Sequence, residues 1–205
     1  MTEYEKMHNG KIYDCLDKEI GKIQKYSHYL CQQYNKLSVY EEIEKKEILK
    51  KLFPNDDFGN YRSMETPIFI DNYKEITIGK NFYSNIHFTF IGGNSVTIGD
   101  NVFIGPYCTL ATGIHSLLAN ERRISKDENG NLHDFEYGKP IKIGNDVWIA
   151  SNVTICGGVS IGNNSVIGAG SVVTKDIPEG VLAFGNPCKV IRKITAEDSM
   201  YLKVK

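Results

Sequence analysis

Histidine is the residue type of this chain best suited to moving a proton near neutral pH, because an unperturbed imidazole titrates at about 6.5. One of the five histidines, His115, stands in the segment Thr-Gly-Ile-His-Ser, where a regular pattern of the sequence stops. A lone histidine is more often a surface or structural residue, so position alone leaves both interpretations open. No Ser-His-Asp or Cys-His spacing accompanies it, which favours direct proton transfer over a covalent intermediate.

Metal chemistry is not indicated by the residues that usually carry it. The five cysteines are scattered, odd in number and form no Cys-x-x-Cys pair, so neither a zinc site nor a disulfide framework is predicted. A three-histidine zinc site would need His87, His115 and His133, and nothing in their spacing supports one. We therefore expect no metal.

The pattern that stops at His115 is a six-residue repeat. It is most regular from Ile143 to Pro178, which reads IGNDVW, IASNVT, ICGGVS, IGNNSV, IGAGSV and VTKDIP. A helix repeats its apolar face every 3.6 residues and a strand every 2, so a strict six is neither. It predicts a short strand plus a corner, repeated as a coil that stacks on itself. Gly168-Ala-Gly-Ser falls within this register without a following Lys-Ser/Thr, which excludes a Walker or Rossmann loop.

Earlier cells extend the coil upstream. Ile98, Ile104 and Leu110 are six apart, and another cell begins at Ile78, 20 residues before Ile98. Twenty is three sixes plus two, so an insertion of about two residues is expected near Ile91–Asn94. The first-position aliphatic residues should point inward and stack between coils.

Corners of the coil are expected where residues tolerate a positive φ, which Gly, Asn and Asp do. Candidate corner pairs occur within the repeat: Asn145-Asp146, Gly157-Gly158 and Asn163-Asn164. Three cells for each coil would give a triangular prism.

The repeat is preceded by one distinct segment and interrupted by another. Apolar residues from Lys18 to Tyr34 have helical spacing, and Ser38 is a candidate N-cap of a second helix, with Glu41 completing a capping box. Residues 113–139 are polar, charged and irregular, and long loops of this kind are often functional. We expect a helical cap over 1–60 and a coil domain over 61–205, with excursion 113–139 and tail 180–205.

Composition excludes several classes of protein. The net charge is −1, with 41% hydrophobic residues, so nothing indicates a nucleic-acid or membrane-surface partner. There is no run of about 18 apolar residues, and the first residues lack the apolar run of a signal peptide. We expect a cytoplasmic protein of one domain with a small appendage.

Longer motifs identify a family. The segments IGDNVFIGP, HSLLANERR, KPIKIGNDVWIASNVTI, GVSIGNNSVIGAGSVVTKDIPEG and GNPCKVIRKI resemble the hexapeptide-repeat acyltransferases, most closely the maltose/galactoside O-acetyltransferase group. The front segment, with GKIYDCLDKEI, CQQYN and EKKEILKKLF, resembles the helical cap of that group. The resemblance implies an all-β core in a left-handed parallel β-helix, and a homotrimer with active sites between subunits. It also implies acetyl transfer from acetyl-CoA to a sugar hydroxyl.

The resemblance assigns roles to individual residues. His115 becomes the general base for direct attack of the hydroxyl, and the backbone N–H of Ser151 becomes a donor to the oxyanion. The implied acceptor contacts are Asn85, Tyr83, Asp71 and Asp14, with Asp17 as the alternative if the alignment of the cap slips. The implied acetyl-CoA contacts are Trp148, Ser151, Ala169, Thr174, Lys175, Lys189 and Arg192. Each has a plainer interpretation, as a corner residue, a solvated carboxylate or a basic tail.

Departures from the family pattern lie on the acceptor side. Gly93 stands where the family commonly has Asp, Gln24 where it often has Arg, and the loop from His115 to Pro140 looks longer. Maltose or a galactoside is therefore in doubt as the substrate, and an amino sugar, serine or antibiotic hydroxyl is the alternative acceptor. A non-enzymatic β-helical binding module is the third possibility.

Overall fold

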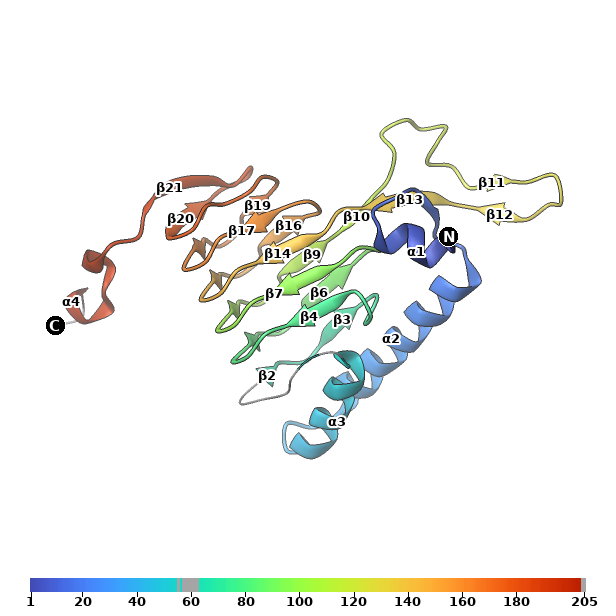
Figure 1. Cartoon of the computed structure of the whole chain (residues 1–205). Helices are drawn as coiled ribbons and strands as arrows, with labels where there is room; N and C mark the ends of the chain where they lie inside the picture. The colour runs from blue at the N-terminus through green and yellow to red at the C-terminus, as the bar shows by residue number, and fades with distance from the viewer. Residues whose placement is uncertain (55, 57–62, 204–205) are drawn as a thin grey trace.

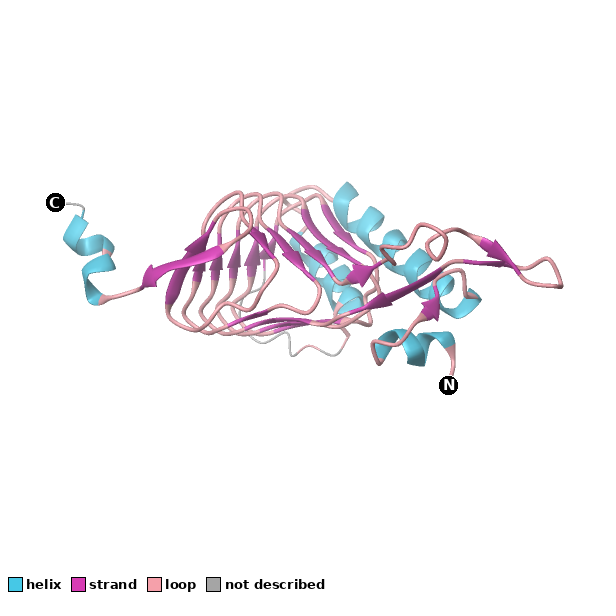
Figure 2. Cartoon of the chain, turned by 90° about the horizontal axis from the view of Figure 1, so that it is seen from above, coloured by secondary structure: helices cyan, strands magenta, loops and turns pink. Residues whose placement is uncertain are grey.

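The computed structural model describes residues 1–54, 56 and 63–203; the expected boundary near residue 60 lies outside them. Three parallel sheets form the sides of a triangular prism. Its coils stack one beside the next, as Figures 1 and 2 show. The first sheet holds β2 (Ser63–Met64), β5 (Tyr83–Ser84), β8 (Phe103–Ile104), β15 (Trp148–Ile149), β18 (Val166–Ile167), β20 (Val181–Phe184) and the antiparallel β21 (Lys189–Lys193). The second holds β3 (Ile68–Ile70), β6 (Phe88–Ile91), β9 (Thr109–Ala111), β16 (Thr154–Cys156) and β19 (Val172–Val173). The third holds β4 (Ile76–Ile78), β7 (Val96–Ile98), β14 (Ile141–Ile143) and β17 (Ser160–Ile161).

The core is the stack of first-position aliphatic residues that the repeat predicts. Ile104, Ile149 and Ile167 pair in register along the first sheet, and each is at most 1% exposed. Burying each such side chain contributes about 1.5–3 kcal/mol relative to exposure. The small second position has a steric cause, because a Cβ at Gly99 would lie 2.8 Å from the backbone of Gly144 in the next coil. Each coil contains three cells, one in each sheet, a number that the six-residue spacing alone does not determine.

One corner of the prism carries a side-chain ladder. Asn101, Asp146 and Asn164 all have a φ near +57° at the turn from the third sheet to the first, as Asn and Asp tolerate. Beside them, the Asn163 side chain accepts from the Asn145 N–H, at 2.8 Å. The expected Asn-Asp and Asn-Asn corners are confirmed.

Every extra residue of the coils leaves from a different corner, between the second and third sheets. Phe90 to Ile98 spans eight residues where the paired positions Ile155 and Ile161 span six, which confirms the two-residue insertion. The excursion leaves from the same place. We call this edge the insertion corner; it comprises residues 71–75, 92–95 and 112–140.

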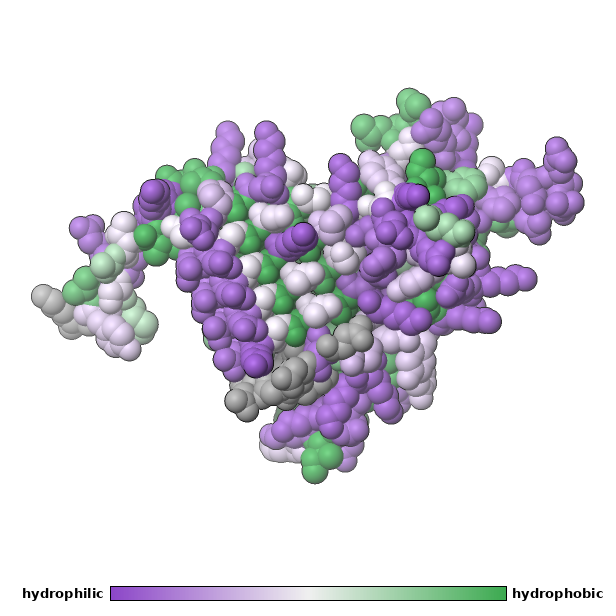
Figure 3. Space-filling model, in the orientation of Figure 1, coloured by the Kyte–Doolittle hydropathy of each residue, from purple (hydrophilic) through white to green (hydrophobic). Residues whose placement is uncertain are grey.

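The excursion has more structure than the sequence indicated. It contains β10 (Gly113–Ile114), β11 (Ser125–Lys126), β12 (Leu132–His133) and β13 (Phe135–Gly138), so the expectation of an irregular loop is wrong. The β11–β12 hairpin projects from the body and is mostly hydrophilic (Figures 1 and 3). Its turn forms because the Asp127 carboxylate accepts from the N–H groups of Asn129 and Asn131. β13 lies between β10 and a strand of the cap.

The cap consists of α1 (Glu3–His8), β1 (Tyr13–Asp14), α2 (Lys18–Lys36) and α3 (Glu42–Leu52). α2 confirms the helical spacing and packs on β3, where Ser27 donates to the Ile70 carbonyl. The Ser38 N-cap is wrong, because α3 begins at Glu42 without a side-chain cap. The Ser38 N–H donates to the Glu41 carboxylate, but the Ser38 hydroxyl accepts from the Tyr40 N–H before the helix starts. At the other end of the chain, η1 (Ala196–Asp198) and α4 (Met200–Lys203) follow β21.

Candidate active site

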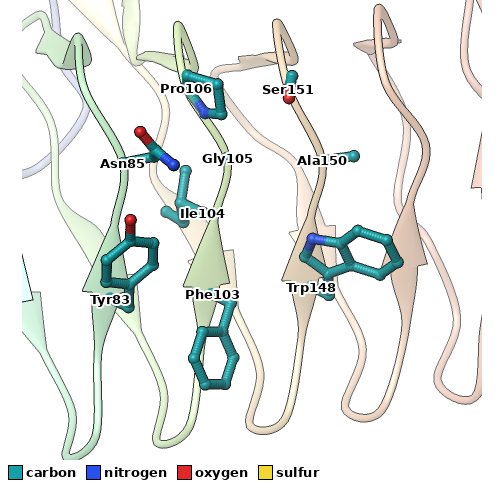
Figure 4. Close-up of a pocket in the computed structure, with 9 residues that line it drawn as sticks. All are labelled: Tyr83, Asn85, Phe103, Ile104, Gly105, Pro106, Trp148, Ala150 and Ser151. Carbon is teal, nitrogen blue, oxygen red and sulfur yellow. The ribbon is translucent and has the colours of Figure 1, made fainter.

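A cavity of about 490 Å³ lies on the outer face of the first sheet, at its corner with the second (Figure 4). Aromatic side chains of three consecutive strands, Tyr83, Phe103 and Trp148, share one register there. Trp148 and Phe103 are 54% and 52% exposed, so their rings are available to a ligand. The cavity is lined by Tyr83, Asn85, Phe103, Ile104, Gly105, Pro106, Trp148, Ala150 and Ser151. Four residues that the sequence selected, Tyr83, Asn85, Trp148 and Ser151, therefore come together.

The Ser151 amide is unusual among its register neighbours. The equivalent N–H of Ile86 donates to the Asn85 side chain at 2.8 Å, and the equivalent Pro106 has no N–H. The Ser151 N–H donates to no acceptor within the described part of the chain. Gly105 keeps the approach open, because a Cβ there would lie 2.7 Å from the Ser151 nitrogen. The sequence did not single out Gly105, although its position in the repeat requires a small residue.

His115 does not line this cavity. It follows β10 on the insertion corner, with its side chain 53% exposed. Its Nε2 lies 3.4 Å from Oε2 of Glu136, which is an ion-pair distance. The second sheet separates the insertion corner from the cavity. One chain therefore brings His115 together with Glu136 but not with Asn85 or Ser151.

Glu136 is a site residue that the sequence did not reveal. It lies on β13, its side chain is 13% exposed, and its Oε1 accepts from the hydroxyl of Tyr13 on β1. Burial and the adjacent Glu136 carboxylate raise the pKa of Tyr13 far above its usual value, so its hydroxyl stays a donor. The pairing of β10 with β13 sets Glu136 opposite His115. Sequence spacing shows no sign of that pairing.

Asp71 lies on the insertion corner and already has protein partners. His28 Nε2 is 2.8 Å from Oδ1, while Gln24 and the Gly92 N–H approach Oδ2 at 3.4 and 3.3 Å. Gln24 and His28 are four residues apart on α2 and therefore share a face. The neutral Gln24 leaves His28 as the ionisable partner of this carboxylate.

Asp14 anchors the excursion to the cap. Its Oδ2 lies 2.7 Å from His133 Nδ1, and its Oδ1 accepts from the N–H groups of Asp134 and Leu16. Burial alone would raise the pKa of this carboxyl, but these hydrogen bonds lower it overall. Asp17, the alternative residue, caps α2 by accepting from Glu19 and Ile20.

Two side chains of the cap fill the space next to the Cα atom of Gly93. A Cβ at this position would lie 2.7 Å from Met7 Cγ and 2.8 Å from Tyr13 Cζ, and closer still to the Tyr13 hydroxyl. Both side chains are buried, at 1% and 2% exposure. Tyr13 therefore occupies the volume that a side chain at position 93 would need.

The remaining selected residues lie on later coils and at the end of the chain, and they are exposed: Ala169, Thr174, Lys175, Lys189 and Arg192. Arg192 makes two hydrogen bonds to Asp198, of 2.6 and 2.7 Å, which holds the pKa of that carboxyl well below its usual range. Arg192 is in register with Trp148 through Val166 and Leu182. At about 4.8 Å per strand the two are about 14 Å apart on one sheet.

Two further observations concern metals and membranes. In residues 1–54, 56 and 63–203, no three His, Cys, Asp or Glu side chains are grouped so that they could hold a metal ion. Over the same residues, the helices are too short or too polar to span a membrane.

The triangular β-helix and its helical cap place this chain in the class of hexapeptide-repeat transferases. Family models agree: "bacterial transferase hexapeptide (six repeats)" matches residues 140–175, and "maltose acetyltransferase hexapeptide capping motif" matches residues 6–56. "Hexapeptide repeat of succinyl-transferase" matches residues 95–115.

Similarity extends over nearly the whole chain. The galactoside O-acetyltransferase of Escherichia coli K12 is 40% identical over 98% of this chain and 94% of its own length. The crystal structure of a maltose O-acetyltransferase from Clostridium difficile 630 is 40% identical, with a TM-score of 0.85 over 95% of this chain and 98% of that one. A galactoside acetyltransferase in complex with coenzyme A is 38% identical, with a TM-score of 0.86 over 97% and 94% of the two chains. This chain belongs to the hexapeptide-repeat acetyltransferases with a maltose-acetyltransferase cap, and its coil is their left-handed parallel β-helix.

Proposed function

We propose that the protein is an acetyl-CoA-dependent O-acetyltransferase that acetylates a hydroxyl of a sugar. Its similarity to galactoside and maltose O-acetyltransferases supports the reaction and the class of acceptor. The complex of one relative with coenzyme A supports the acetyl donor. The observation that carries the proposal is the pocket, where the Ser151 N–H has no acceptor among the residues that the structure describes.

In this mechanism His115 takes the proton of the acceptor hydroxyl while the oxygen attacks the thioester carbonyl. The tetrahedral oxyanion accepts a hydrogen bond from the Ser151 N–H. Collapse of the intermediate breaks the carbon–sulfur bond and leaves the acetyl ester. The imidazolium then returns its proton to the departing CoA thiolate, so CoA leaves as the thiol.

A complete site requires two copies of the chain. His115 and the pocket lie on separate edges of one prism, and acetyl transfer needs the base and the oxyanion donor within bonding reach of one carbonyl. We propose that the insertion corner of one subunit faces the pocket of its neighbour. Three such contacts close a homotrimer with three active sites.

The donor extends along the first sheet. Trp148 flanks the pantetheine arm in the pocket, and Arg192 lies about 14 Å away in the same register, at roughly 4.8 Å per strand. Lys189 and Arg192 bind the CoA phosphates as cations, and Arg192 exchanges its hydrogen bonds to Asp198 for phosphate oxygens. The other donor contacts are Ala169, Thr174 and Lys175.

The acceptor lies between the pocket and the insertion corner. Asn85 and Tyr83 contact it from the pocket side, and Asp71 contacts it from the insertion corner. Asp14 acts near the acceptor through the excursion that it anchors. Because Gly93 and Gln24 replace residues that the resemblance leads one to expect, acceptor choice is set by a different combination of groups.

The experiment is steady-state release of CoA thiol with a panel of glucose, maltose, galactosides, amino sugars and serine. His115→Ala should lower kcat by about 10²–10⁴-fold, as expected for loss of a general base, with acetyl-CoA affinity retained. The matched control is His8→Ala, a histidine of the cap 57% exposed at its side chain. Unchanged turnover in His115→Ala refutes the mechanism. A properly assembled protein that releases no CoA with any acceptor refutes the activity and favours a binding module.

A further inference from the structure

We infer that Glu136 is a positioning residue that acts through His115, and that Tyr13 of the cap holds it in the space left open by Gly93. The inference rests on the proposed function, because it gives His115 a partner in the proton transfer. It follows from the geometry of three elements that are far apart in sequence: β1, β13 and the turn after β10.

The two oxygens of Glu136 have separate partners. Oε1 accepts from the Tyr13 hydroxyl, and Oε2 lies 3.4 Å from His115 Nε2. Tyr13 is a neutral donor, so it fixes the carboxylate in place without cancelling its charge. The charge is left facing the imidazole.

This charge matters at the moment of proton transfer. When His115 takes the hydroxyl proton it becomes an imidazolium, and an adjacent carboxylate favours that charged form. A carboxylate beside one ring nitrogen also favours the ring orientation that keeps that nitrogen toward it. With Nε2 directed at Glu136, Nδ1 is the nitrogen left to meet the acceptor hydroxyl.

Gly93 makes this arrangement possible. A Cβ at position 93 would overlap the Tyr13 ring, so any larger residue would move the hydroxyl that holds Glu136. β1 pairs with β13 so that Tyr13 lies opposite Glu136. The cap is thereby part of the machinery that orients the base.

The test begins with Glu136→Gln, which keeps one oxygen to accept from Tyr13 and replaces the charged oxygen that faces His115 by a neutral NH2 group. It should lower kcat by about 10–100-fold, the range for loss of a residue that orients a functional ligand, and leave the KM for acetyl-CoA within about twofold. Tyr13→Phe should lower kcat in the same direction by a smaller factor. Asp127→Asn, which removes a carboxylate from the hairpin turn of the same excursion, is the control and should leave kcat unchanged.

A double-mutant cycle decides between action through His115 and any other role. In the His115→Ala background, Glu136→Gln should have no further effect on the residual rate. The inference is overturned if the same fold-loss persists there, or if only the acceptor KM rises. If Glu136→Gln fails to fold, Tyr13→Phe in both backgrounds provides the same cycle. Wild-type turnover in His115→Ala would refute the proposed function, whereas wild-type turnover in Glu136→Gln beside an inactive His115→Ala would refute this inference alone.

Discussion

Adding a single methyl group at Gly93 should disturb the packing of the cap against the insertion corner. In Gly93→Ala the new Cβ would meet Tyr13 and Met7 well inside contact distance. Met7 has a flexible side chain, but Tyr13 is an aromatic ring held by its hydrogen bond to Glu136. The ring must therefore move by about 1 Å or more to reach an ordinary contact near 3.5–4 Å.

The size of the effect follows from the packing around this site. Inserting a carbon into a close-packed interior costs about 1–3 kcal/mol. For a chain of this length, each kcal/mol corresponds to about 2–4 °C, so the thermal midpoint should fall by roughly 2–12 °C. The turnover number should fall as well, because the displaced hydroxyl no longer holds Glu136.

Gly21→Ala is the matched control, and its expected change in stability has the opposite sign. Gly21 lies inside α2, and a Cβ there would have no neighbour within 4 Å. Replacing glycine by alanine in a helix interior stabilises by about 0.8–1 kcal/mol, so this variant should melt slightly higher and keep full activity. Both midpoints are measured by calorimetry at one protein concentration, because assembly contributes to stability.

A cycle with Tyr13→Ala completes the test. Removing the ring makes room for the new methyl group, so Gly93→Ala should destabilise the Tyr13→Ala protein less than the wild type. A coupling of about 1–3 kcal/mol is expected for residues in direct contact. The packing argument would be refuted if Gly93→Ala had wild-type stability. It would also be refuted if the stability losses of Gly93→Ala and Tyr13→Ala were additive in the double variant.

Three further predictions concern the hairpin and the cavity on the first sheet. The pKa of His133 is raised, first by Asp14 and then by Asp127, so its stabilisation is complete below about pH 6.5 and is lost as pH rises through the folded value. The pKa of Asp127 is lowered to about 2, so the stability that its carboxylate contributes is already present above about pH 4. The difference in thermal midpoint between wild type and His133→Gln should therefore be larger at pH 5.5 than at pH 8.5. A difference that is the same at both pH values contradicts this prediction. Gly105→Ala and Gly99→Ala should destabilise alike, since each Cβ meets backbone of the next coil, but only Gly105→Ala should also lower kcat, by obstructing the Ser151 N–H; equal turnover in both would exclude that role. Trp148 is the single tryptophan, so saturating acetyl-CoA should change its fluorescence emission, and the Kd should rise at high salt. Unchanged emission, although equilibrium dialysis shows that acetyl-CoA binds, would exclude Trp148 from the donor site.

The coil could be predicted from the sequence because its physics is local and repeated. The repeat places a buried aliphatic residue every six positions and a small residue beside it. The aliphatic residues predict the core, and the small residues predict the close spacing of the coils. Even the extra two residues before Ile98 were readable as a departure from the period. The pocket followed in part, since Tyr83 and Trp148 face outward in the same register.

The contacts of His115 on the insertion corner could not be predicted in the same way. Glu136 meets His115 only because β13 folds back on β10, and Tyr13 meets Glu136 only because the cap adds a third strand. These pairings join segments separated by up to 123 residues, and no period connects them. α1 was missed because six residues are too few to show a helical pattern. The Ser38 assignment failed because only one of the two hydrogen bonds of a capping box forms, from the Ser38 N–H to the Glu41 carboxylate. The chain makes a turn after Ser38, and the helix starts later, at Glu42.

The placement of the extra residues has a physical reason under the proposed mechanism. An extended CoA needs a regular face, and the strands of the first sheet from β15 to β20 keep their register without interruption. Insertions there would disrupt the ladder that carries the donor. The insertion corner carries no such constraint, so the excursion, the cap and the base can all be built on it. If a neighbouring subunit supplies the donor face, donor binding and acceptor choice lie on separate edges of one chain, and acceptor specificity can be altered at residues 71–75, 92–95 and 112–140 without disturbing the binding of acetyl-CoA.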